Sequence, residues 1–278
     1  MNLFGIPEAR HFCKFSRRSG SCAGPLQQFV DTSLKGHTSI KEGTSAFDEY
    51  RDCFLRDTER CIFLSISLYR RSLDLMMPGS SSWAHVTLYY SSFYAARALL
   101  GLFGGWVNKY GKKYIEVSKA KPGLQELTIR AVSSTFGGSH QKFWELFYNS
   151  MPPLFPWVDS KFRFALEPVS GKSDWLIQNR NDVNYDTHTA FQLIRKFQVD
   201  FNKASFPGSL PGVLGTQYGI TDGLLSILLP FANQFGIATD ALDILTPAGS
   251  RKHKSNLLIF KAKPHKLLSG AKLSSLIS

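Results

Sequence analysis

Residues 83–103, WAHVTLYYSSFYAARALLGLF, constrain the fold of this chain more than any other stretch. Large apolar side chains recur there at three- and four-residue steps, as expected for an α-helix. Two neighbouring stripes of this helix are apolar or small, so the helix should be buried on most of its sides. Its serines and alanines would also let a second helix approach closely. The stretch therefore predicts a central helix in a mainly α-helical bundle.

A second long helix is predicted before the central one, and a change of pattern follows it. Apolar residues recur at helical spacing from about 46 to 77, and Pro78 and Gly79 would end that helix. Residues 110–132 have short apolar runs on both sides of a Pro-Gly pair, which predicts an inserted β-hairpin. Further helices are predicted over 141–151, from the polar stretch after 175 to about 201, near 222–235 and near 239–245.

The charge of the chain is concentrated at its two ends. The net charge is +12, yet residues 42–249 carry twenty Lys/Arg and nineteen Asp/Glu. Residues 1–41 carry six basic and two acidic residues, and residues 250–278 carry seven basic residues and no acid. Basic ends of this kind bind phosphate backbones by releasing counterions, or remain as solvated tails.

Four parts of the chain follow from these patterns. We expect a basic flexible segment over 1–43 and a helical domain over 44–204 that contains the hairpin. Additional helices over 205–249 would pack on the bundle, and a basic tail would cover 250–278. Both termini are expected to be partly disordered. The candidate nucleic-acid-binding residues of the tail are Arg251, Lys252, Lys254, Lys261 and Lys263.

Several classes of protein have no support in the sequence. No apolar run reaches the roughly 18 residues that a membrane span needs. The first residues lack the continuous apolar segment of a secretory signal, so we expect a cytoplasmic protein. Phosphate-binding glycine loops, the HExxH and GxSxG motifs and Cys/His clusters at zinc spacing are absent. The sequence therefore predicts neither a metal nor a cofactor.

The candidate site is the polar stretch 175–191, WLIQNRNDVNYDTHTAF. Seven polar or charged residues crowd into nine of its positions: Arg180, Asn181, Asp182, Asn184, Tyr185, Asp186 and His188. One interpretation is helix capping and solvation, with Arg180 paired to a nearby aspartate and Asp186 or Thr187 acting as an N-cap. The other is a site for an anion such as an RNA phosphate, which a planar guanidinium suits.

Two segments together resemble the HEPN superfamily. HVTLYYSSFYAARALLGLFG is similar to its aromatic and small-residue helix, and RNDVNYD resembles the start of its Arg-x(4–6)-His motif. The resemblance implies a helical bundle that forms a homodimer and cleaves RNA without a metal. Arg180 would then stabilise charge on the phosphoryl oxygens, Asn181 would hold the groups in place, and a histidine would orient or deprotonate the ribose 2′-hydroxyl.

The spacing departs from that motif at the histidine. Seven residues separate Arg180 from His188, and Tyr185 occupies the commonest position of the motif histidine. Eight helical positions correspond to a rise of about 12 Å, and a tyrosine with a pKa of about 10 is a poor base at neutral pH. Two functions stay open. One is an endoribonuclease of a defence or toxin–antitoxin system, with an antitoxin or defence partner protein, and the other is a non-catalytic dimerisation module.

Overall fold

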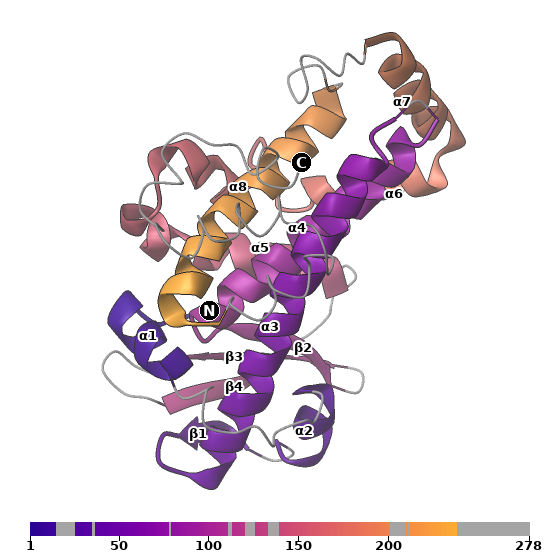
Figure 1. The fold of residues 1–278 in the computed structure, drawn as a ribbon. Coiled ribbons are helices and arrows are strands. Elements are labelled where there is room, and N and C mark those ends of the chain that lie inside the picture. Colours follow the sequence, from indigo (N-terminus) through magenta and orange to yellow (C-terminus); the bar gives the residue numbers. More distant parts are fainter. Residues whose placement is uncertain are drawn as a thin grey trace, which may run out of the picture.

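The computed structural model describes residues 1–14, 26–34, 37–77, 79–110, 113–119, 126–132, 139–200, 210 and 212–237. Within these ranges the protein is mainly helical and has a small antiparallel sheet of four strands, so the mainly α prediction is confirmed (Figure 1). In chain order the elements are α1 Ile6–Lys14, α2 Leu26–Thr32, β1 Ser39–Lys41, α3 Ser45–Asp74, α4 Ser81–Leu102, β2 Trp106–Tyr110, β3 Lys113–Lys119, β4 Glu126–Val132, α5 Ser139–Ser150, the 3-10 helices η2 Pro152–Trp157 and η3 Ser160–Leu166, α6 Trp175–Tyr185, α7 Thr187–Asp200 and α8 Gly212–Phe235.

The long helix α3 packs closely against the central helix α4. Ser65 and Ser91 exchange hydrogen bonds across the pair, each hydroxyl donating to the other residue's carbonyl oxygen at 2.9 and 2.7 Å. Further along, Gly101 of α4 lies against the side chain of Thr58. These contacts show that the two helices are antiparallel, and small residues at the seam let them approach as the sequence predicted.

Helix α8 lies along another side of α4. Ser92 bonds to Thr221 through the two hydroxyl groups at 2.7 Å, and the Gln217 amide donates to Ser92 at 3.0 Å. Phe103, just after α4, contacts the ring of Phe231. Both helices therefore advance in the same direction. Helices α3 and α8 both lie along α4 (Figure 1), and they also contact each other, since the hydroxyls of Tyr69 and Tyr218 are hydrogen-bonded at 2.8 Å.

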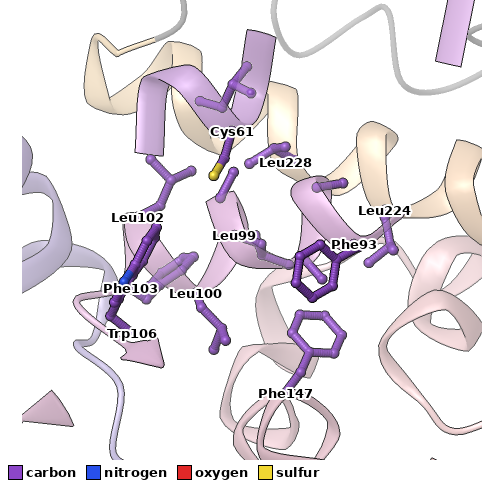
Figure 2. Packing of buried hydrophobic residues seen from close by; sticks show 14 of the residues in the cluster. Cys61, Phe93, Leu99, Leu100, Leu102, Phe103, Trp106, Phe147, Leu224 and Leu228 are labelled. Atoms are coloured by element: carbon purple, nitrogen blue, oxygen red, sulfur yellow. The ribbon is translucent and has the colours of Figure 1, made fainter. Parts of the chain in front are cut away.

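The hydrophobic core follows α4 from one end to the other. Leu88, Leu99 and Leu102 are fully buried, which confirms the prediction of a central helix. Figure 2 shows how this core joins distant elements, because Cys61 of α3, Leu224 and Leu228 of α8 converge on it. The helix exposes part of only one stripe, and this stripe carries Tyr90.

The small sheet is larger than the hairpin that the sequence predicted. Strands β2, β3 and β4 are antiparallel neighbours, and β1 adds to the outer edge of β4, which gives the order β1-β4-β3-β2. The extra strand β1 comes from residues 39–41, before α3. Trp106 of β2 contacts the ring of Phe54, so the sheet is fixed to the end of the bundle where α4 finishes.

The structure differs from the sequence prediction at residues 1–43. Where a flexible segment was expected, the described residues form α1, α2 and β1 (Figure 1). Phe4, Phe12 and Phe29 are buried, and Phe12 contacts the rings of Phe47 and Phe54 on α3. These short segments are held by aromatic contacts with a distant helix, which local periodicity does not reveal.

The remaining helix predictions have mixed outcomes. Helices α5 and α8 confirm those near 141–151 and 222–235, while residues 239–245 and the tail 250–278 lie outside the described residues. Thr44 is the N-cap of α3, because its hydroxyl accepts a hydrogen bond from the backbone N–H of Phe47. None of the described helices is long and apolar enough to cross a bilayer.

We expect substitution by alanine to change the stability of the protein in opposite directions at two helical glycines, Gly101 and Gly219. A Cβ atom at position 101 would overlap the Thr58 side chain, whereas one at Gly219 of α8 would meet only Phe164 at 4.0 Å. We expect Gly101→Ala to lower the free energy of unfolding by about 1–2 kcal/mol, because the strain exceeds the gain in helix propensity. Gly219→Ala should raise it by up to about 1 kcal/mol.

Urea unfolding of the two variants beside the wild type measures both effects. Equal changes at the two glycines would contradict the close approach of α3 and α4. The double variant Gly101→Ala with Thr58→Ala should recover part of the loss, because it removes the hydroxyl and methyl that the new Cβ would meet.

A candidate anion site at Arg180

Arg180 is turned toward the bundle by the helix that carries it. In α6, Leu176 and Val183 are buried, and Arg180 lies four residues after the first and three before the second. Residues at these spacings share one helix face, and α6 packs with this face toward α4. The guanidinium carbon of Arg180 lies 5.0 Å from the ring centre of Tyr89 and 5.8 Å from that of Tyr90.

His140, at the start of α5, completes the group around Arg180. Its Nδ1 atom forms a 2.6 Å hydrogen bond with the hydroxyl of Tyr89. Its ring stacks on Phe93, with ring centres 4.3 Å apart and planes 14° apart. We call Arg180, Tyr89, Tyr90, Phe93 and His140 the Arg180 site; these residues come from three elements that are distant in the sequence.

The imidazole of His140 is uncharged at neutral pH. Burial lowers its pKa to about 4, and the positive charges of Arg180 and Arg97 act in the same direction. Burial raises the pKa of Tyr89 to about 12, so its phenol keeps its proton. The Nε2 atom of His140 makes no hydrogen bond within the described residues.

A second guanidinium, on α4, also acts on His140 with positive charge. The guanidinium carbon of Arg97 lies 5.6 Å from the ring centre of Phe93 and 4.5 Å from that of Trp106. Burial raises the pKa of the Asp57 carboxyl on α3, and the positive charge of the nearby Arg97 offsets only part of that rise. Positive charge therefore approaches the imidazole from two helices, α4 and α6.

Arg180 is not neutralised by a carboxylate. Among the described residues it forms no ion pair with an aspartate or glutamate. Its Nε atom is buried without a hydrogen-bond partner there, and its side chain is only partly exposed. A half-buried cation beside polarisable rings and without a counter-ion is favourable for an incoming anion.

The neighbouring aspartate has a structural role. Asp186 separates α6 from α7, and its carboxylate accepts hydrogen bonds from the backbone of His188 at 3.1 Å and of Thr189 at 3.2 Å. These bonds, together with one from the Thr189 hydroxyl, lower the pKa of Asp186. The capping interpretation of the polar stretch is thus confirmed for Asp186, while Arg180 faces the other way into the aromatic group.

The other predicted site residues are not gathered around Arg180. His188 is exposed in the first turn of α7, and Tyr185 exposes 74% of its side chain at the end of α6. Asn181 is half-buried next to Arg180 in the chain. No contact of His188 or Tyr185 with Arg180 occurs in the described part of the chain, so their roles stay predictions.

Two further predictions concern the tail and metals. Arg251, Lys252, Lys254, Lys261 and Lys263 lie outside the described residues. Within the residues that are described, no three His, Cys, Asp or Glu side chains gather in a way that could hold a metal ion. The Arg180 site itself offers one guanidinium, which suits an anion.

His85 is a buried histidine of α4 that does not belong to the Arg180 site. Its burial leads us to expect that the protein loses stability in acid. It is fully buried on α4, and neither ring nitrogen has a partner among the described residues. Burial lowers its pKa from 6.5 to about 4. Because the unfolded chain binds this proton more readily, stability is lost as pH falls below about 6.5.

We expect the free energy of unfolding to drop by about 2 kcal/mol between pH 7 and pH 5 through this residue. Urea unfolding of His85→Leu should show a correspondingly smaller dependence on pH. The matched variant at the exposed His188, His188→Leu, should behave as the wild type. An unchanged dependence in His85→Leu would contradict a neutral buried imidazole.

Comparison of the chain with models of protein families, with curated proteins and with solved structures finds no match.

Proposed function

We propose that this protein acts on RNA as a metal-independent endoribonuclease, with Arg180 as the group that contacts the phosphate. One observation carries the proposal. The Arg180 guanidinium has no carboxylate partner among the described residues and lies over Tyr89, whose hydroxyl is bonded to the neutral imidazole of His140. A cation for the phosphate and a proton acceptor for a hydroxyl are the two groups that such a reaction needs.

The proposed reaction is an internal transfer on the RNA strand. The ribose 2′-oxygen forms a bond to the adjacent phosphorus, and the bond from phosphorus to the 5′-oxygen of the next nucleotide breaks. A 2′,3′-cyclic phosphate remains on one product, and the 5′-oxygen of the other product takes a proton from water and becomes a hydroxyl. No oxidant, metal or attacking water is required for this step.

The Arg180 site supplies two groups for this reaction in the proposal, a cation for the phosphate and an acceptor for the 2′-hydroxyl proton. Arg180 neutralises the charge that grows on the phosphoryl oxygens, and its planar fork suits two of them. His140 takes the proton of the 2′-hydroxyl at Nε2 when Nδ1 carries the hydrogen of its bond with Tyr89. That bond and the stacking on Phe93 hold the imidazole in one orientation.

RNA cleavage in EDTA tests this function. Labelled single-stranded RNA should be cut by the wild type without a divalent ion, and the products should carry 2′,3′-cyclic phosphate ends. The same oligonucleotide with 2′-deoxyribose should stay intact, because the attacking oxygen is missing. Folded protein that leaves every RNA uncut, or that cuts the deoxyribose strand equally well, would overturn the proposal.

Exposed aromatic side chains favour a second candidate, a non-catalytic dimerisation module. Trp83 of α4 and Phe191 of α7 expose 63% and 58% of their side chains, and the helices that carry them pack against each other. Exposed aromatic residues on packed helices are typical of protein contacts. A concentration-dependent dimer that Trp83→Ser weakens, together with an absence of RNA cleavage, would favour this candidate.

The HEPN resemblance implies further partners, which belong to the same proposal. They are a homodimer formed by two copies of the chain, a partner protein of antitoxin or defence type, and a cytoplasmic location where RNA is accessible. If the exposed aromatic surface forms the homodimer, the endoribonuclease and the dimerisation module describe two properties of one protein.

A further inference from the structure

The charged side chains that act on His140 are both cationic. Arg180 from α6 and Arg97 from α4 both act on it with positive charge, and its Nδ1 is bonded to Tyr89. The other ring neighbours are Phe93 and Tyr90. Nothing among the described residues offers the imidazole a negative partner, so it stays neutral while the site is empty.

An entering anion would reverse this balance. A tetrahedral dianion beside Arg180 would offset the positive charges that disfavour the imidazolium form, and it would accept a hydrogen bond from Nε2. The hydrogen bond between Nδ1 and Tyr89 can remain in place, because the imidazolium donates at both nitrogens and the phenol oxygen accepts.

We propose that the Arg180 site is a proton-linked binding site for a tetrahedral dianion of the phosphate class, held between the Arg180 guanidinium and the imidazolium of His140. The proposal rests on the proposed function in that the same two side chains would meet the RNA phosphate. It goes further, because it states that the anion and one proton bind together. Terminal phosphate groups of nucleotides and RNA ends, with two negative charges, would therefore bind more tightly than singly charged anions.

Proton linkage gives the site a defined response to pH. If one proton is taken up with each anion, the affinity rises by up to about tenfold for each unit by which the pH falls. The rise ends near the pKa of His140 in the empty protein, which is about 4. Sulfate is a suitable probe, because it stays a dianion throughout the range from pH 5 to pH 8.

Titration calorimetry with sulfate at pH 7.5, 6.5 and 5.5 tests the inference. The full chain should bind sulfate at least about tenfold more tightly at pH 5.5 than at pH 7.5, with uptake of a proton that buffers of different ionisation enthalpy reveal. His188→Gln should follow the wild type, since His188 is exposed on α7. His140→Gln should lose the pH dependence but keep weak binding to Arg180.

The inference is overturned if the wild type binds sulfate with the same affinity at the three pH values, or if His140→Gln keeps the full pH dependence. These results are separate from the RNA assay. Cleavage of RNA together with pH-independent sulfate binding would overturn the inference and leave the proposed function standing. Proton-linked sulfate binding without RNA cleavage would support the inference and overturn the function.

Discussion

Arg180→Ala is expected to reduce the rate of RNA cleavage by about 100- to 1,000-fold, the usual effect of removing one donor that stabilises transition-state charge. The side chain is half-buried, has no carboxylate partner among the described residues and is set over Tyr89 and Tyr90. No other described cation lies over these two rings. The loss should therefore appear mainly in kcat, because charge on the phosphoryl oxygens is greatest in the transition state.

A matched arginine distinguishes this effect from a general loss of positive charge. Arg195 is exposed on α7, and Arg195→Ala changes the net charge by the same amount. We expect it to retain cleavage to within about twofold, with a slightly shallower salt dependence of RNA binding, because one cation that can release a counterion is lost. Arg180→Lys should be intermediate, since it keeps the charge and loses the planar fork. Equal losses in Arg180→Ala and Arg195→Ala would contradict a specific role for Arg180.

His140→Gln is expected to reduce kcat by about 100-fold or more, because the glutamine amide cannot take a proton from the 2′-hydroxyl.

The pH dependence of RNA cleavage by the wild type gives a second test of the role of His140. The acid limb of kcat/KM reports the free protein and should fall near pH 4, where burial and the two arginines set the pKa of His140. The acid limb of kcat reports the complex and should lie at higher pH, because bound phosphate favours the imidazolium.

His188→Gln is the control, and it also tests the residue that the sequence pattern suggested. His188 is exposed and lies beyond the break at Asp186, so this variant should keep both the rate and the pH profile of the wild type. If His188→Gln loses cleavage and His140→Gln retains it, the sequence motif identifies the base and our assignment of His140 is incorrect. Circular dichroism and urea unfolding confirm that each variant is folded.

Much of the helical framework could be predicted from the sequence, because it depends on local patterns. The apolar and small residues of α4 predicted a buried central helix, and the repeated apolar steps of α3 predicted its long neighbour. The N-terminal elements could not be predicted in the same way. Phe12 and Phe29 are buried by contacts with α3, far along the chain, and β1 depends on pairing with β4.

Two residues of this region could be recognised from their neighbours in the sequence, whereas a third is brought to the site only by the fold. Arg180 stood out in a crowded polar stretch, and Asp186 was a foreseeable N-cap, since both features depend on neighbours in sequence. His140 carried no such signal. It is the second residue of α5, forty positions before Arg180, and only the packing of α5 and α6 around α4 brings it to Tyr89. The resemblance to the HEPN motif indicated Tyr185 and His188 instead.

A crystal structure of the protein with an uncleavable RNA, one with 2′-fluoro-ribose at the scissile position, tests the central claim most directly. We expect one phosphate of that strand to accept hydrogen bonds from the Arg180 guanidinium and the 2′-fluorine to lie next to Nε2 of His140, while Nδ1 stays on the Tyr89 hydroxyl. An RNA bound elsewhere, with Arg180 still covering Tyr89 and Tyr90 and no phosphate within hydrogen-bond distance of either side chain, would contradict it.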